Sequence, residues 1–123
     1  MATLGDRVFD NGLSTLSTEA NKLVITSQET ATFTEANVTY ALGNTTTLSI
    51  ASPSDRTGGG REVVVAAISD GSVTADGTAT HYAIVDTVNS RLLATGSLTT
   101  TQVVTTGNTF SLGSFTIGIP DPA

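Results

Sequence analysis

The clearest structural signal in this sequence is a pair of β-strand patterns joined by a short turn in residues 78–98, TATHYAIVDTVNSRLLATGSL. Residues 78–87 are typical of a long strand, in which His81, Ala83 and Val85 would lie on one face and Tyr82 and Ile84 on the other. Val, Asn and Ser then interrupt the pattern at residues 88–90, and it resumes in residues 91–98. We therefore expect an antiparallel β-hairpin here, with a mainly β fold around it.

The composition agrees with that expectation. The 123 residues include 24 Thr and 12 Ser, whereas only 13% are charged and 5% are aromatic. Thr and Val branch at Cβ, which stiffens the side chain and favours the pleated backbone. Short strand patterns separated by Gly, Asn and Asp recur along the chain, so the sequence predicts an antiparallel β-sandwich or a small barrel.

Further strands and turns follow from the same patterns. The apolar run within residues 61–69 predicts a central strand covered on both faces, because neither face is polar. The apolar positions change parity at Gly113-Ser114, which predicts a β-bulge. The remaining expected strands are residues 22–27, 46–51, 72–75 and 99–106, and the expected turns are Gly43-Asn44, Asp70-Gly71, Asp76-Gly77 and Gly107-Asn108.

The N-terminal segment differs from the rest, because its apolar residues follow a helical period. Phe9, Leu13, Leu16 and Ala20 are spaced by four, three and four residues, which places them on one stripe of an α-helix. We expect this helix to begin near Asp6 and to pack its narrow apolar stripe on the sheet or on a neighbouring subunit.

A second helical turn is expected in residues 33–40. Thr32 and Glu35 have the spacing of a capping box, in which the hydroxyl and the carboxylate each accept a backbone N–H of the other residue.

We expect one domain, residues 1–123, with an N-terminal arm and helix in 1–21, a β domain in 22–119 and a C-terminal tail in 120–123. Pro120 and Pro122 are expected to end the last strand. Residues 52–60 are polar, contain a Pro and end in three Gly, so they predict an exposed, mobile loop rather than a linker between domains.

Charge and composition exclude several classes of function. Five Lys and Arg residues against 11 Asp and Glu give a net charge of −6, so we expect no nucleic-acid binding. No apolar run approaches the roughly 18 residues that predict a membrane-spanning helix, and the first residues lack a signal-peptide pattern. The absence of Cys excludes disulfides and cysteine metal sites.

Three stretches hint at chemistry, and each has a simpler structural interpretation. His81 could belong to a catalytic triad, but no nucleophile-elbow pattern accompanies it. Residues 70–76 hold two Asp in a loose resemblance to a calcium loop, but the oxygen ligands needed by calcium are too few. Residues 57–61 are Gly-rich, but a phosphate-binding loop requires a Lys and a following helix. We therefore expect no enzymatic activity, no cofactor and no metal, and the few aromatic residues argue against a glycan-binding platform.

Several segments carry a resemblance to a known family. They are residues 25–29, 34–36, 40–43, 70–86, 91–98, 107–110 and 117–121. From about Lys22 onward, the chain resembles a group of small virion proteins encoded by tailed bacteriophages. The resemblance implies a virion structural part, most often a capsid decoration (cement) protein, which binds the major capsid protein on the outer capsid surface.

A decoration protein stabilises an assembled shell through many weak contacts, and a homotrimer would multiply them. The expected contact segments are polar and close to the N-terminus or to the Gly-rich loop. Their candidate residues are Thr3, Leu4, Arg7, Asp55, Arg56 and Arg61. The alternative is a head-fibre or tail protein that binds a receptor or a glycan, and a hydrolase using His81 ranks last.

Overall fold

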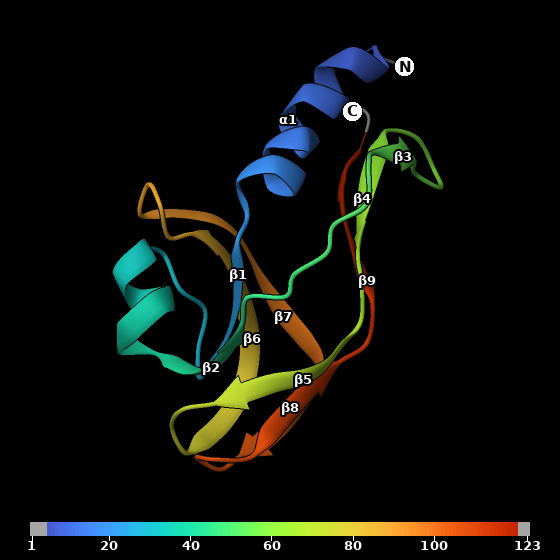
Figure 1. Ribbon diagram of the computed structural model, residues 1–123. Helices are drawn as coiled ribbons and strands as arrows, with labels where there is room; N and C mark the ends of the chain where they lie inside the picture. Colours follow the sequence, from blue (N-terminus) through green and yellow to red (C-terminus); the bar gives the residue numbers. More distant parts are fainter. Residues whose placement is uncertain (1–4, 121–123) are drawn as a thin grey trace. The chain divides into compact units, whose positions relative to one another are not determined.

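The computed structural model describes residues 5–120 and has the expected mainly β fold with one N-terminal α-helix (Figure 1). The chain forms two compact units, which we describe separately. The first comprises residues up to Glu19, residues Ser49–Ala67 and residues from Gly113 onward, and the second comprises Ala20–Leu48 and Ile68–Leu112. No helix in the described part of the chain is long and apolar enough to cross a membrane.

The first unit consists of the helix and a small antiparallel sheet (Figure 1). Its elements are α1 (Asp6–Glu19), β3 (Ser54–Asp55), β4 (Arg61–Val65) and β9 (Phe115–Ile119), with the sheet in the order β3-β4-β9. The helix confirms the N-terminal prediction for Phe9, Leu13 and Leu16, which are all buried, whereas Ala20 lies beyond its end and is half-buried. The Pro120 that follows β9 agrees with the expected end of the last strand, whereas Pro122 lies outside the described residues.

The apolar run within residues 61–69 does form the central strand of this sheet, but it is covered on only one face. Val63 and Val65 are fully buried, whereas Val64 between them is 37% exposed. The run is also divided, because β4 ends at Val65 and Ile68 begins a strand of the other sheet. The expected covering of both faces is therefore wrong, since an apolar run alone does not distinguish a buried face from an exposed Val.

The second unit is a curled six-stranded antiparallel sheet, which forms a half-barrel (Figure 1). The order of strands is β7-β6-β1-β2-β5-β8. They are β1 (Lys22–Thr26), β2 (Ala41–Thr45), β5 (Ile68–Val73), β6 (Gly77–Asp86), β7 (Arg91–Val104) and β8 (Thr109–Leu112).

The β6–β7 hairpin confirms the strongest prediction from the sequence, with Asp86 opposite Arg91 at its closed end. β7 continues through Val104, so the two strands expected in residues 91–98 and 99–106 are one. Its register is irregular, because Thr80 of β6 lies opposite all of residues 98–101.

The core of the second unit lies along its central strands. Leu23, Val24 and Ile25 of β1 and residues 83–85 of β6 are at most 1% exposed. A short helical segment, η1 (Glu35–Thr39), contributes the buried Ala36, which packs in one cluster with Val24. Burial on both faces agrees with the position of these two strands in the interior of the sheet, with a paired strand on each side.

The capping interaction before η1 is present, with one change. Thr32 Oγ1 accepts a hydrogen bond from the Glu35 N–H at 3.1 Å, as expected. The Glu35 carboxylate accepts the N–H of Ala31 at 2.8 Å instead of that of Thr32. The helical turn expected in residues 33–40 is therefore present, and over Glu35–Thr39 it is a π-helix.

Two expected features around residue 45 are wrong. Gly43-Asn44 lies inside β2 rather than in a turn, because Gly43 permits close approach of the neighbouring strand: a Cβ there would lie 2.5 Å from the Ser72 carbonyl oxygen. No strand forms over residues 46–51. Thr45 Oγ1 accepts the Thr47 N–H at 3.2 Å, and such a local bond favours a turn over a ladder.

Two further Gly positions also differ from expectation. Asp70-Gly71 lies within β5 rather than in a turn, and Gly71 makes room for the ring of Phe110 on β8. The chain bends after β5 instead, near the expected turn at Asp76-Gly77. Gly113-Ser114 is not a bulge, because β8 and β9 on its two sides belong to different sheets.

Candidate functional site

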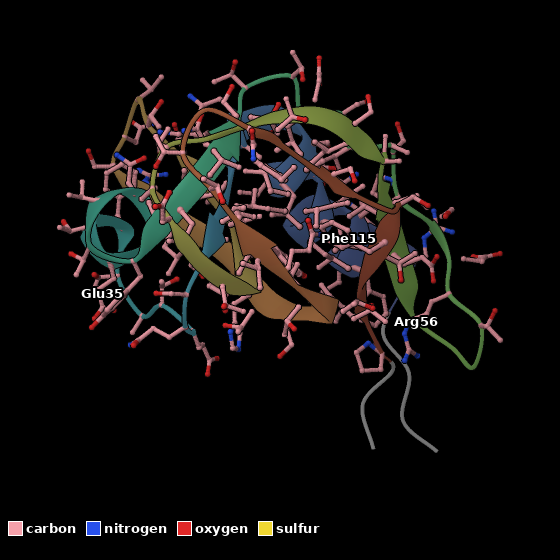
Figure 2. All side chains as sticks on the ribbon, turned by 90° about the horizontal axis from the view of Figure 1, so that it is seen from below. Glu35, Arg56 and Phe115 are labelled. Carbon is pink, nitrogen blue, oxygen red and sulfur yellow. The ribbon has the colours of Figure 1, made fainter. Side chains whose placement is uncertain are left out.

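The six candidate contact residues have different positions. Thr3 and Leu4 lie outside the described residues, and Arg7 is exposed in the first turn of α1. Asp55, Arg56 and Arg61 belong to the β3–β4 hairpin of the first unit. The geometry of the site is therefore described for this hairpin. Figure 2 shows the side chains of the molecule, with Arg56 labelled.

The Gly-rich loop is a hydrogen-bonded hairpin turn. Asp55 and Arg61 are paired across it, and the N–H of Arg56 donates to the Gly60 carbonyl at 3.1 Å. Gly58, Gly59 and Gly60 all have left-handed backbone angles, with φ of 91°, 104° and 89°. Such angles strain any residue with a Cβ, which explains three consecutive Gly. The loop is mostly polar and exposed, as expected.

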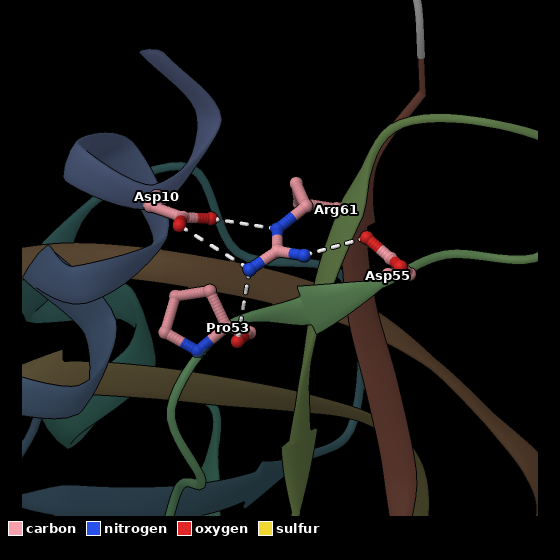
Figure 3. A network of polar contacts seen from close by, with 4 residues as sticks. All are labelled: Asp10, Pro53, Asp55 and Arg61. Atoms are coloured by element: carbon pink, nitrogen blue, oxygen red, sulfur yellow. Dashed lines mark hydrogen bonds and ion pairs between the residues drawn. The ribbon is translucent and has the colours of Figure 1, made fainter. Parts of the chain in front are cut away.

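Arg61 is held by a network of polar contacts on both sides of its guanidinium group (Figure 3). Its Nε donates to Asp10 Oδ1 at 2.9 Å and its Nη2 to Asp10 Oδ2 at 3.3 Å, a fork onto the helix. Its Nη1 donates to Asp55 Oδ1 at 2.6 Å, and Nη2 also reaches the Pro53 carbonyl at 3.3 Å. The Arg61 side chain is only 16% exposed.

Because of this network, Asp55, Arg56 and Arg61 have different roles in the hairpin. Arg61 links α1 to the base of the hairpin, so its guanidinium acts within the fold. Asp55 is 90% exposed and presents its second carboxylate oxygen to the outside. Arg56 lies near the turn, where Nη1 donates to the Gly59 carbonyl at 3.0 Å and the side chain lies close to Gly118 of β9. The outward-facing charged group of the hairpin is therefore the Asp55 carboxylate, whereas Arg56 is half-buried.

Sequence reasoning missed Asp10, the partner that fixes Arg61. The two residues are 51 positions apart, and no local pattern connects a helix carboxylate to one particular cation on a strand. The only available signal was that Asp10 lies one residue after Phe9 of the buried helical stripe, at the border of the covered face.

The side chains considered for chemistry, His81, Asp70 and Asp76, all lie in the second unit. His81 is half-buried on β6, and its Nδ1 lies 2.8 Å from Thr80 Oγ1. Asp76 accepts the Thr106 N–H at 2.7 Å, and hydrogen bonds from Thr106 lower the pKa of its carboxyl. Asp70 is exposed on β5, and no group of three or more His, Cys, Asp or Glu that could hold a metal ion occurs among residues 5–120.

Comparisons of this chain with protein families, with curated proteins and with solved structures found no match.

Proposed function

We propose that this chain is a structural protein of a tailed-phage virion, and that it decorates and stabilises the outer surface of the assembled capsid. The observation that carries this proposal is the sequence resemblance from about Lys22 onward. Its longest segment, residues 70–86, covers the last four residues of β5, the following bend and all of β6. Buried residues such as Ala83 and Ile84 form part of it, so the resemblance concerns the fold rather than a catalytic motif.

The surface chemistry supports a binding role that needs no reaction. Thr99, Thr100 and Thr101 are all exposed on β7. A Thr side chain offers a methyl group for packing and a hydroxyl for hydrogen bonding without like-charge repulsion. Many such weak contacts add up when a repeated surface presents them together, as a capsid does.

The proposed contact with the major capsid protein includes the β3–β4 hairpin and the start of α1. Asp55 is exposed next to a turn that the hydrogen bond from the Arg56 N–H to the Gly60 carbonyl closes, Arg56 is half-buried beside it, and Arg7 is exposed on the helix. A preformed turn loses little conformational entropy on binding, which favours it as a contact element. We further propose a homotrimer as the bound form.

The direct test mixes the purified protein with capsids that lack it, taken from the phage that encodes it. We expect co-sedimentation with the capsid and a higher temperature for the release of packaged DNA. Failure to bind, or binding without any gain in particle stability, would reject the decoration role. Binding to host cells or glycans without binding to capsids would favour the head-fibre or tail alternative.

A pair of variants tests the contact surface. Asp55→Ala removes an exposed carboxylate from the hairpin, and Asp70→Ala removes an exposed carboxylate from β5 in the other unit. We expect Asp55→Ala to weaken capsid binding several-fold and Asp70→Ala to leave it unchanged. Equal effects of the two variants would contradict the assignment of the hairpin as the contact.

A further inference from the structure

The outer edge of β9 is a regular strand edge that no other strand in the described part of the chain pairs with. β9 is the last strand of the β3-β4-β9 sheet, and its five residues pair with β4 in unbroken register. The other edge of β4 is covered differently, by β3 and by the Ile50–Val65 bridge. A free edge exposes backbone N–H and C=O groups that can pair with another strand.

The side chains of β9 leave an apolar face that is only partly covered. Phe115, Ile117 and Ile119 lie opposite Val65, Val63 and Arg61 of β4, so all six share one face of the sheet. α1 lies on this face, since Arg61 binds Asp10 and a Cβ on Gly12 would lie 3.7 Å from Ile119 Cδ1. Val63 and Val65 are fully buried, whereas the three β9 side chains are half-buried. Figure 2 shows the position of Phe115.

β9 itself also carries no charged side chain. Edge strands of monomeric proteins commonly carry Lys or an inward-pointing charge, but β9 reads FTIGI. No charged residue stands between Arg91 and Asp121, although the whole chain has a net charge of −6. Two copies of this acidic protein repel each other in general, whereas β9 has no charged residue of its own and the charged side chain beside Gly118 is the cationic Arg56.

We propose that β9 pairs in antiparallel fashion with β9 of a second copy, about a two-fold axis at Ile117. In this register Ile117 faces its own counterpart, Phe115 faces Ile119 of the second copy, and the pairing preserves the apolar face. The two sheets become one six-stranded sheet, with the helix of each copy covering its own half.

This contact does not depend on the capsid role. It has two-fold symmetry, so a homotrimer of the kind proposed above would use it to join one trimer to a neighbouring trimer. Without a trimer contact, the protein forms a dimer. The assembled mass therefore corresponds to an even number of chains in either case.

The first experiment measures that mass in solution at increasing protein concentration. A dimer or another even-numbered species supports the β9 pair. A strict monomer at the highest soluble concentration, or a trimer that associates no further, overturns it. Neither result bears on whether the protein binds capsids, which the sedimentation assay decides separately.

The second experiment uses the absence of Cys from the chain. Ile117→Cys places one thiol opposite its own copy at the centre of the pair, and mild oxidation should give a covalent dimer in high yield. Val64→Cys is the matched control, because Val64 is exposed on the opposite face of the neighbouring strand. Equal cross-linking of the two variants indicates random collision and overturns the proposal.

A charge variant provides a test that does not rely on oxidation. Ile117→Lys places two ammonium groups directly opposite each other, so the concentration of half-dissociation should rise at least about tenfold, with Val64→Lys as the control. Should Ile117→Lys fail to fold, Thr116→Lys adds a charge to the exposed face of the same edge strand. An unchanged mass for a folded edge variant overturns the proposal.

Discussion

The ion pairs of Arg61 with Asp10 and with Asp55 should contribute different amounts to the free energy of unfolding. Asp10 receives two hydrogen bonds from the guanidinium and is 33% exposed, whereas Asp55 receives one and is 90% exposed. Charged hydrogen bonds that are partly shielded from water contribute about 1.5–3 kcal/mol, whereas exposed ion pairs contribute below about 1 kcal/mol. We expect Asp10→Ala to lower the free energy of unfolding by the larger amount and Asp55→Ala by the smaller, as measured by urea denaturation. Equal losses would contradict the role of Asp10 as the main anchor of Arg61.

A single Gly also decides whether two strands can lie side by side. A Cβ on Gly43 would lie 2.5 Å from the Ser72 carbonyl oxygen and 3.1 Å from the Val73 Cα, and neither backbone atom can move aside cheaply. Gly43→Ala should therefore cost about 1–3 kcal/mol, the usual range for forced overpacking. Gly113→Ala is the control, because a Cβ there meets no atom within 4 Å. Thermal denaturation of both variants tests the difference, and a neutral Gly43→Ala would refute the close-approach explanation.

At the scale of elements, the β6–β7 turn is closed by one carboxylate. Asp86 is 2% exposed, and it accepts the side-chain amide of Asn89 at 2.8 Å and the N–H of Val88 at 3.0 Å. The hydrogen bond from the Asn89 side chain is the main cause that lowers the pKa of Asp86 below its ordinary value of 3.8. A lowered pKa in the folded state means that the ionised carboxylate stabilises the fold above pH 3.8, and that this contribution disappears as the pH falls below that value.

The corresponding prediction concerns how the stability of the fold falls as the pH is lowered. Asp86→Asn keeps an oxygen acceptor in the turn but removes the titration. We expect the urea midpoint of the wild type to fall more steeply between about pH 5 and pH 2 than that of the variant, since only the wild type must protonate this group. Parallel profiles for the two proteins would show that Asp86 does not contribute to acid unfolding.

The elements that were predictable from the sequence are those with a sustained period. The helix around Leu13 follows from its helical spacing and β6 from a long run of strand-forming residues between two turn signals, so both are found where expected. Gly residues were the main source of error, because a Gly next to Asn or Asp predicts a turn from sequence alone. Gly43 and Gly71 instead make room for the neighbouring strand and for Phe110, and such long-range approaches leave no local signal.

The candidate site follows the same rule. The sequence predicted an exposed polar loop around Asp55 and Arg56, because turn residues act locally, but it did not predict that β3 and β4 pair on its two sides as a hairpin. It could not predict that Arg61 is held by Asp10, since that choice depends on how a helix lies on a strand far away in the chain. The apolar edge of β9 was also hidden, because the parity change at Gly113 predicts a bulge equally well as a move to another sheet.

At the scale of the whole molecule, the two units differ in how their chain segments are connected. The first unit is assembled from three separate segments, with the second unit's residues between them. Its sheet has only three strands, one of them two residues long. The second unit has six strands and a centre where Leu23, Ile25 and Ile84 are fully inaccessible to solvent. Local opening costs least where few buried apolar groups must be exposed, so the first unit should open more readily.

Amide hydrogen exchange tests this expectation residue by residue. We expect the amides of β4 and β9 to exchange faster than those of β1 and of residues 83–85 in β6, because these central strands open only with the whole sheet. Leu13→Ala, which removes a buried side chain of α1, should then accelerate exchange in β4 and leave β1 unchanged. An equal acceleration in both sheets would show instead that the two units unfold as one cooperative body, and the slow exchange of β1 would then measure the stability of the entire chain.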